Sequence, residues 1–236
     1  MSIHLVGGGW SDAAASEVFG GFLEECAARA EDRRTPRVSL VLMGTDADAL
    51  EYHQRYVRAL GLAGGPHELA ITRVEEGTPC PDAALEDVDG LFVGGGPTPE
   101  YHASIAPLFA RVRELVAGGL PYLGFSAGAA IAAERAVIGG WRIDGVVVCP
   151  EEANEELEDV TVVDGIGLVP FSVDVHSSQW GTLGRLVAAV EAGLTPVGVA
   201  VDESTVLTVG EQLVVRGEGR ARRVTVGDGG VAVGRI

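Results

Sequence analysis

The pentapeptide Gly124–Gly128 reads GFSAG, which is the Gly-x-Ser-x-Gly spacing of a nucleophile elbow. In such an elbow a buried strand ends in a tight turn that exposes a serine hydroxyl, and a helix begins directly after the turn. The free N–H groups and the dipole of that helix stabilise negative charge. Because a strand is predicted at 121–125 and a helix at 129–133, Ser126 is predicted to be a nucleophile for acyl transfer, with a turn of small residues as the alternative.

Acyl transfer also needs hydrogen-bond donors for the oxyanion. One donor is predicted at the backbone N–H of Ala127, directly after the nucleophile. Gly95 and Gly96 are predicted to supply others, because they follow a buried strand at the carboxyl edge of the sheet, where ligands bind in open α/β folds. Glycine permits the close backbone approach that this role requires. A plain loop or a phosphate-binding turn is the alternative for this glycine triplet.

Five histidines are candidates for the general base. His4 lies in a predicted strand, His67 at the start of another, and His53 in a predicted helix. At such places a structural or exposed histidine is more common than a catalytic one. His102 follows the glycine triplet closely and is predicted to line the pocket. His176 lies in a polar loop between a strand and a helix, which suits a base held over the elbow. We therefore predict His176 as the base.

A carboxylate should orient the imidazole of the base. Asp144 follows a short strand-like stretch behind the elbow helix. Asp174 lies two residues before His176, so on a strand the two side chains would share a face. Glu203 lies at the end of an apolar strand. Spacing alone leaves all three carboxylates open.

The elements that must position these residues alternate between strand and helix. Strands are predicted at 3–6, 38–43, 67–72, 90–93 and 121–125, and helices at 12–33, 47–61, 98–117, 129–133 and 179–192. This alternation predicts an α/β fold with a doubly wound, mostly parallel sheet. From residue 196 onward, short strands separated by Gly and Asp predict antiparallel β additions in the C-terminal third. We expect one domain over 1–236, without a linker or an internal repeat.

The composition excludes several classes of partner. A formal net charge of −17 leaves no basic patch for nucleic acid or for an anionic membrane, although it would steer a cationic substrate favourably. The three cysteines have no zinc-site spacing and favour a reducing compartment. We see no signal-peptide pattern at the N-terminus and no apolar run of membrane-spanning length. The expected location is therefore the cytoplasm.

Taken together, these motifs resemble peptidase family S51, which holds cyanophycinase and the aspartyl dipeptidase called peptidase E. The strand and glycine triplet at Leu91–Gly96 and the run GFSAGA at Gly124–Ala129 match the first half of the family pattern. The later signature is matched at Asp174–His176, Gly184–Leu186 and Asp202–Thr205. The resemblance spans about residues 36 to 207, and the combination is specific although each part alone is not.

The resemblance implies a serine peptidase with a fold like that of class I glutamine amidotransferases. It implies cleavage of a peptide or isopeptide bond in a small peptide through an acyl-enzyme, with no metal and no organic cofactor. In cyanophycinase the acid lies a short way past the nucleophile, and Asp144 occupies the matching place. The resemblance therefore favours Asp144 as the acid, with Glu203 as a pocket residue or a substitute. A homodimer is left open.

Three departures from the family pattern touch expected substrate-binding positions. Pro97 stands where peptidase E-like members carry Asn, and Trp180 and Thr182 stand where cyanophycinases carry arginines. We therefore do not expect this protein to share unchanged the aspartyl specificity of peptidase E or the binding of an acidic polymer backbone by cyanophycinase. The side chains expected to line the substrate site are those of Pro97, Thr98, His102, Asp174, Gln179, Trp180, Arg185 and Glu203.

Three alternatives to a peptidase stay open on the sequence. One is an esterase or amidase that acts on a non-peptide substrate, including an α/β-hydrolase, although some sixty residues follow His176 here. Another is a catalytically silent binding protein that keeps the fold. A glutamine amidotransferase would need a cysteine in place of Ser126.

Overall fold

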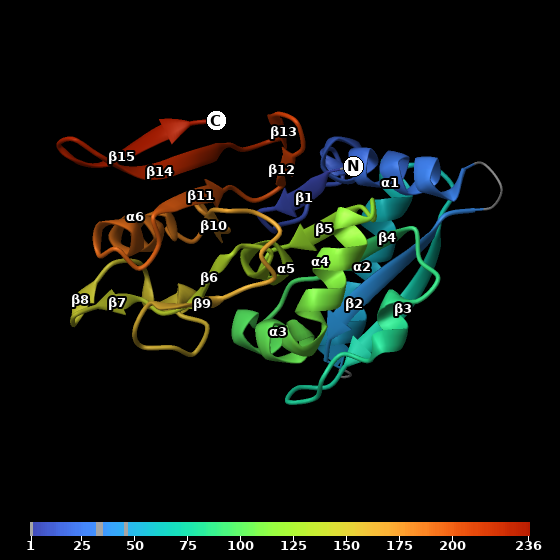
Figure 1. The fold of residues 1–236 in the computed structure, drawn as a ribbon, viewed down its shortest axis with the longest axis horizontal. Helices are drawn as coiled ribbons and strands as arrows, with labels where there is room; N and C mark the ends of the chain where they lie inside the picture. The colour runs from blue at the N-terminus through green and yellow to red at the C-terminus, as the bar shows by residue number, and fades with distance from the viewer. Residues whose placement is uncertain (1, 32–34, 45–46) are drawn as a thin grey trace.

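The structure is a computed structural model that describes residues 2–31, 35–44 and 47–236. A seven-stranded sheet has the order β13-β12-β1-β5-β4-β2-β3 (Figure 1). Its strands are β1 (Ile3–Val6), β2 (Arg37–Met43), β3 (Glu68–Val74), β4 (Gly90–Val93), β5 (Tyr122–Phe125), β12 (Thr205–Val209) and β13 (Leu213–Gly217). The first five pair in parallel, whereas β12 and β13 are antiparallel additions. The predicted α/β fold with a mostly parallel sheet and antiparallel C-terminal strands is confirmed.

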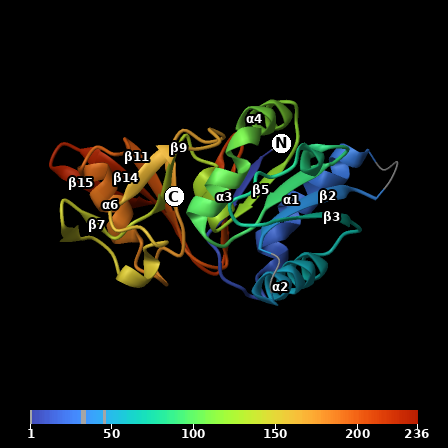
Figure 2. The ribbon, with the colours of Figure 1, turned by 90° about the horizontal axis from the view of Figure 1, so that it is seen from below.

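Helices cover both faces of this sheet (Figure 2). They are α1 (Ala15–Ala30), α2 (Ala47–Ala63), α3 (Thr98–Ile105), α4 (Phe109–Ala117) and α5 (Ala127–Ile131). Buried side chains of α1 and α2 pack on one face, and those of α3, α4 and α5 pack on the other. The strands β4 and β5 are buried along their whole length, which explains their nearly continuous apolar sequences. Because helices cover both faces of the sheet, the loops that carry the candidate site lie at its carboxyl edge.

Three predicted helices differ clearly from the observed ones. The predicted helix 179–192 begins only at Leu183 and ends at Glu191. The predicted helix 98–117 is interrupted, since α3 ends at Ile105 and the 3₁₀ turn η2 (Ala106–Leu108) precedes α4. Pro107 lies in that turn, and a proline lacks the N–H that a continuous helix would use there. The predicted helix 12–33 begins only at Ala15, and its last residues, 32 and 33, lie outside the described residues.

A second sheet is built from the C-terminal half of the chain. Its order is β10 (Ser172–Asp174), β11 (Val197–Val201), β14 (Ala221–Gly227) and β15 (Gly230–Arg235), and α6 (Leu183–Glu191) packs on it. Two small antiparallel pairs are β6 (Arg135–Gly139) with β9 (Thr161–Asp164), and β7 (Arg142–Ile143) with β8 (Val146–Val147). The remaining 3₁₀ turns are η1 (Asp82–Leu85) and η3 (Glu151–Ala153). This part lies beside the parallel sheet (Figures 1 and 2).

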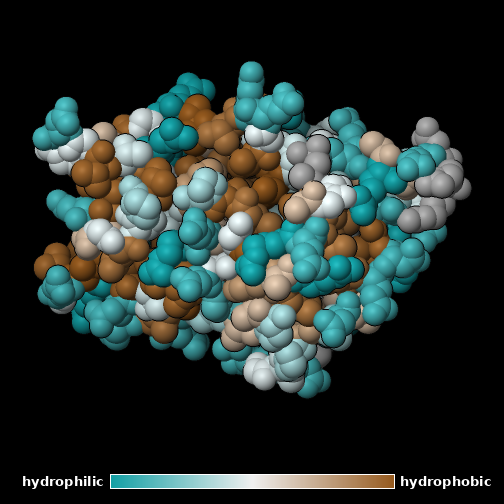
Figure 3. Space-filling model, in the orientation of Figure 1, coloured by the Kyte–Doolittle hydropathy of each residue, from teal (hydrophilic) through white to brown (hydrophobic). Residues whose placement is uncertain are grey.

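Hydrophilic residues cover much of the face drawn in Figure 3, with hydrophobic residues between them. Such a surface fits a chain with a formal net charge of −17. None of the helices in the described part of the chain is long and apolar enough to cross a bilayer.

Candidate active site

Ser126 occupies the sharp turn between β5 and α5. Its backbone has φ 52° and ψ −109°, a conformation that costs a non-glycine residue free energy and is found at nucleophile elbows. The turn is held because the N–H of Ser126 donates to the carbonyl of Val6 at 2.9 Å. A Cβ on Gly128 would lie 2.3 Å from the carbonyl oxygen of Val93, so only glycine lets α5 start this close to β4. The predicted elbow is therefore present in the structure.

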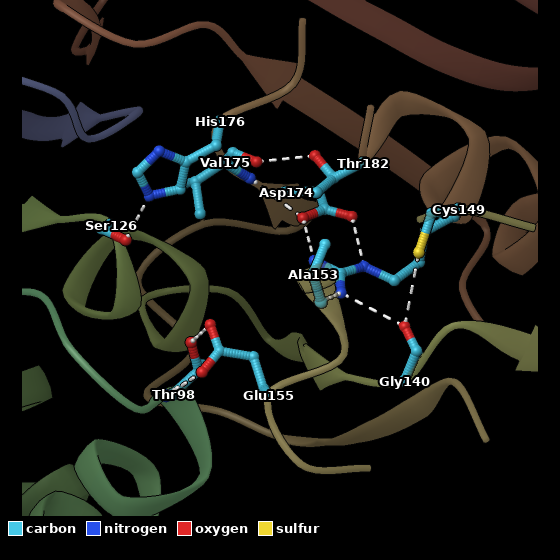
Figure 4. A network of polar contacts seen from close by, with 11 residues as sticks. Thr98, Ser126, Gly140, Cys149, Ala153, Glu155, Asp174, Val175, His176 and Thr182 are labelled. Atoms are coloured by element: carbon cyan, nitrogen blue, oxygen red, sulfur yellow. Dashed lines mark hydrogen bonds and ion pairs between the residues drawn. The ribbon is translucent and has the colours of Figure 1, made fainter. Parts of the chain in front are cut away.

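The hydroxyl of Ser126 lies 2.8 Å from Nε2 of His176 (Figure 4). His176 follows β10 in a buried loop, and its own N–H donates to the carbonyl of Gly7 at 2.9 Å. A Cβ on Gly8 would lie 2.1 Å from Cε1 of the imidazole, so the ring needs a glycine at this place. The structure therefore brings together the predicted nucleophile and the predicted base.

Glu203 is the carboxylate that contacts the imidazole, and the choice of Asp144 was wrong. Oε1 of Glu203 lies 2.6 Å from Nδ1 of His176. Asp144 is exposed and, with Gly145, forms the turn that joins β7 and β8. Both turn residues have positive φ, as a two-residue Asp-Gly hairpin requires. This Asp-Gly pair was a signal in the sequence against a role for Asp144 in the site.

The loop before β12 holds Glu203 in place. The backbone N–H of Glu203 donates a hydrogen bond to Oε1 of Gln179 at 3.0 Å. The N–H of the next residue, Ser204, donates to the carbonyl of Gly8 at 2.7 Å. A Cβ on Gly9 would lie 2.5 Å from Cβ of Glu203. The first glycine triplet, residues 7–9, therefore makes room for both the imidazole of His176 and the side chain of Glu203, a role that the sequence did not reveal.

Burial lowers the pKa of His176, while the hydrogen bond and the negative charge of Glu203 raise it. The net direction is downward. The resting imidazole is therefore neutral at neutral pH, which is the form that can accept a proton from a hydroxyl.

Two tyrosines fix the peptide groups of Gly95. The N–H of Gly95 donates to the hydroxyl oxygen of Tyr56 at 2.7 Å, and the hydroxyl of Tyr101 donates to the carbonyl of Gly95 at 3.3 Å. The predicted oxyanion role of Gly95 is therefore not supported, because its donor is already engaged. Within the described ranges the N–H of Gly96 has no acceptor. The N–H of Ala127, the first residue of α5, has no acceptor within its helix.

Asp174 and Arg185 form a buried ion pair and do not line the substrate site as predicted. Nε and Nη2 of Arg185 lie 2.9 and 2.7 Å from the two carboxylate oxygens of Asp174. Nη1 donates to the carbonyls of Gly140 and Ala153 at 3.2 and 2.6 Å (Figure 4). Burial lowers the pKa of Arg185, but the charge and hydrogen bonds of Asp174 outweigh this effect, so the pKa of the guanidinium is raised. The pair fixes the end of β10 two residues before His176.

A cleft of about 720 Å³ lies over Ser126. The residues that line it are Gly96, His176, Glu203, Trp180, the acidic segment 152–156, Trp10, Tyr52 and Arg55, among others. A wider hollow of about 1140 Å³ between α1, η1 and α4 contains none of the reacting groups described above. The cleft over Ser126 therefore combines space for a substrate with a candidate nucleophile.

The remaining predicted pocket residues are distributed as follows. Trp180 lines the cleft. Gln179 is not among the lining residues, but its Oε1 accepts a hydrogen bond from the N–H of Glu203, which does line the cleft. Pro97 is exposed at the start of α3 and is not among the residues that line the cleft. Nε2 of His102 lies 2.8 Å from the carbonyl oxygen of Asp164, so the predicted pocket role of His102 is not supported.

Glu155 is a cleft residue that the sequence analysis did not single out. Its carboxylate accepts hydrogen bonds from the N–H and the hydroxyl of Thr98 at 3.1 and 3.2 Å (Figure 4). Burial raises its pKa, although the hydrogen bonds from Thr98 oppose this. The predicted substrate-site residue Thr98 thus anchors the acidic segment to the start of α3. Among the residues that the structure describes, no group of three or more His, Cys, Asp or Glu is arranged to hold a metal ion.

Comparisons with known proteins identify the family of this chain. The model of the family described as peptidase family S51 matches residues 35–215. Cyanophycinase from Trichormus variabilis is 31% identical over 159 residues, which are 64% of this chain and 50% of the relative. Peptidase E from Shewanella denitrificans is 29% identical over 171 residues, which are 66% of this chain and 64% of the relative. The chain therefore spans about half the length of the cyanophycinase that it matches.

The crystal structure of a peptidase from an acI-B1 actinobacterium has a related fold. Its TM-score is 0.66 at 17% sequence identity, and the match covers 100% of this chain and 96% of the other. At this identity the likeness shows the fold alone. The family model, however, covers well over half of the sequence. The chain belongs to peptidase family S51.

Proposed function

We propose that this protein is a serine-type peptidase that hydrolyses a peptide or isopeptide bond in a small peptide through an acyl-enzyme on Ser126. The observation that carries the proposal is the continuous chain of contacts from Ser126 through His176 to Glu203, at 2.8 and 2.6 Å. Nucleophile, base and orienting acid have the order and distances that acyl transfer needs. Membership of family S51 and the named peptidase relatives support the same activity.

In the acylation step, Oγ of Ser126 attacks the carbonyl carbon and its proton passes to Nε2 of His176. The carbonyl electron pair moves to the oxygen, which accepts hydrogen bonds from the N–H groups of Gly96 and Ala127. The C–N bond then breaks, and the amine leaves with the proton from Nε2. Glu203 accepts a hydrogen bond from Nδ1 and so keeps the tautomer that leaves Nε2 free.

In the deacylation step, a water molecule attacks the ester carbon and gives one proton to Nε2 of His176. The bond between Oγ of Ser126 and the acyl carbon then breaks. Oγ takes the proton back from Nε2, and the carboxylic acid product is released. The serine and the imidazole are thereby restored to their starting protonation states.

The cleft supports a small substrate. A volume of about 720 Å³ lies in the range typical of small-molecule sites. Its walls are closed on one side by the segment 152–156, which Glu155 ties to Thr98. A dipeptide or short peptide fits this geometry better than an extended polymer.

Hydrolysis of a panel of dipeptides and of β-Asp-Arg-type polymers tests the proposal. Ser126→Ala is expected to lower kcat by about three orders of magnitude or more, because it removes the nucleophile. Ser16→Ala is a matched control, since Ser16 is exposed on α1 away from the cleft and should leave kcat unchanged. Turnover at the wild-type rate in Ser126→Ala would end the proposal.

A further inference from the structure

The indole ring of Trp180 lies flat against the imidazole of His176. The ring centroids are 3.9 Å apart and the planes are inclined by 8°. The backbone N–H of Trp180 donates to the carbonyl of His176 at 2.8 Å, which closes the short turn between the two residues. Trp180 therefore contacts both the backbone and the imidazole ring of His176.

The exposure of Trp180 indicates that it does more than fill the core. The side chain is 44% exposed and lines the cleft. Exposing a large aromatic surface forgoes much of the stabilisation that its burial would give. One face of the indole lies against the imidazole. A smaller or polar side chain would serve a merely structural turn at this place equally well.

The imidazole becomes positively charged when it takes the proton of Ser126. A cation over an aromatic face is stabilised by the ring quadrupole, and the indole of tryptophan is the most effective ring. Among the charged groups around His176, Glu203 is the one hydrogen-bonded to the imidazole. The others are Asp174 and Arg185 behind it, and Arg55, Glu152, Glu155 and Glu156 around the cleft. Among the aromatic rings in the described part of the chain, the indole of Trp180 is the one stacked on the imidazole.

We propose that Trp180 is a positioning residue, whose indole face holds the His176 imidazole in line between Ser126 and Glu203 and stabilises the imidazolium that forms during acyl transfer. The proposal rests on the proposed function insofar as it concerns turnover. It assigns a role to a residue that differs from the arginine expected at this place in cyanophycinases.

Trp180→Phe and Trp180→Leu form a matched pair that separates the aromatic face from simple hydrophobic cover. Both variants shield the imidazole from water, but only phenylalanine offers a π face. For the best substrate of the panel, Trp180→Leu should lower kcat by about 2- to 30-fold relative to Trp180→Phe, with KM changed less than about 2-fold. Equal kcat values for the two variants, or an effect confined to KM, would overturn the proposal.

Titration of the His176 imidazole by NMR tests the same idea without a substrate. The His176 signal is identified by its absence in His176→Gln. An aromatic face favours the protonated ring, so the titration midpoint of Trp180→Leu should lie about half a pH unit or more below that of Trp180→Phe. Tyr52→Leu is the control, because it removes an exposed aromatic ring of the cleft that makes no contact with the imidazole, and the midpoint should stay unchanged.

The two measurements distinguish failure of this proposal from failure of the proposed function. Equal midpoints in Trp180→Phe and Trp180→Leu would remove the role of Trp180 even if Ser126-dependent hydrolysis is found. A lower midpoint in Trp180→Leu would support the stacking even if the protein hydrolyses none of the peptides. Both variants are expected to fold, since the side chain that is changed is 44% exposed.

Discussion

At the scale of single residues, the imidazole of His176 has a partner at each ring nitrogen. Glu203 contacts Nδ1 at 2.6 Å and Ser126 contacts Nε2 at 2.8 Å. An ionised carboxylate can only accept, so the proton of the neutral ring is assigned to Nδ1 and the lone pair to Nε2. Because burial lowers the pKa of His176, this neutral form is the resting one. The unprotonated Nε2 of the imidazole therefore faces the hydroxyl of Ser126, as the proposed mechanism requires.

Glu203→Gln tests which carboxylate orients this ring. The neutral amide can donate to Nδ1 and so favour the wrong tautomer, and it no longer stabilises the imidazolium. We expect kcat to fall by about 10²- to 10⁴-fold. Asp144→Asn is the matched control, since Asp144 is exposed in the β7–β8 turn, and its kcat should equal that of the wild type. The opposite order of the two effects would restore Asp144 as the acid.

At the scale of elements, the loop after β1 is as important to the site as the elbow after β5. The carbonyls of Gly7 and Gly8 accept hydrogen bonds from the N–H groups of His176 and Ser204. These bonds join the loops after β10 and β11 to the parallel sheet. The absence of side chains at residues 7–9 lets the imidazole and the carboxylate of Glu203 lie directly on the loop.

Gly8→Ala should therefore damage catalysis specifically. Gly8 has φ 89°, and the new methyl group would lie 2.1 Å from Cε1 of His176. Gly64→Ala is a close control, because Gly64 has φ 91° with nothing within 4 Å of the added methyl. The two glycines have nearly the same φ, which costs an alanine on the order of 1 kcal/mol, but only the methyl group of Gly8→Ala would displace the imidazole. We expect kcat to fall at least about 10²-fold in Gly8→Ala alone.

Equal kcat values in these two variants would show that the loop does not position the imidazole. Thermal unfolding of both proteins, measured alongside, separates a loss of activity from a loss of folded protein. Similar melting temperatures with different kcat values are the expected result.

The elbow could be predicted from the sequence because its strand, turn and helix are contiguous. The base and the acid are harder to predict, since His176 lies 50 residues from Ser126 and Glu203 a further 27 residues on. Which carboxylate reaches the ring depends on how β10 and β11 pair, and this pairing leaves no local pattern. The sequence also shows no sign that the N–H of Gly95 is engaged, because its acceptor Tyr56 lies in α2, 39 residues earlier in the chain.

At the scale of the whole molecule, the strand alternation was enough to predict the parallel sheet with its covering helices. The second sheet was not predicted, because β14 and β15 have the same short alternating pattern whether they extend the first sheet or build another. The buried pair of Asp174 and Arg185 joins β10 to α6 in this second part. The single domain, the glutamine amidotransferase-like class, the homodimer and the cytoplasmic location stay predictions.

The central claim is that Ser126 carries the acyl group, and mass spectrometry can test it without knowledge of the natural peptide. The protein is mixed with an activated p-nitrophenyl ester of a short acyl amino acid, quenched in acid within the first turnover and digested. We expect an initial release of about one p-nitrophenol per protein molecule, with the acyl mass on the peptide that contains Ser126. An equal release from Ser126→Ala, or the acyl mass on another residue, would contradict the account.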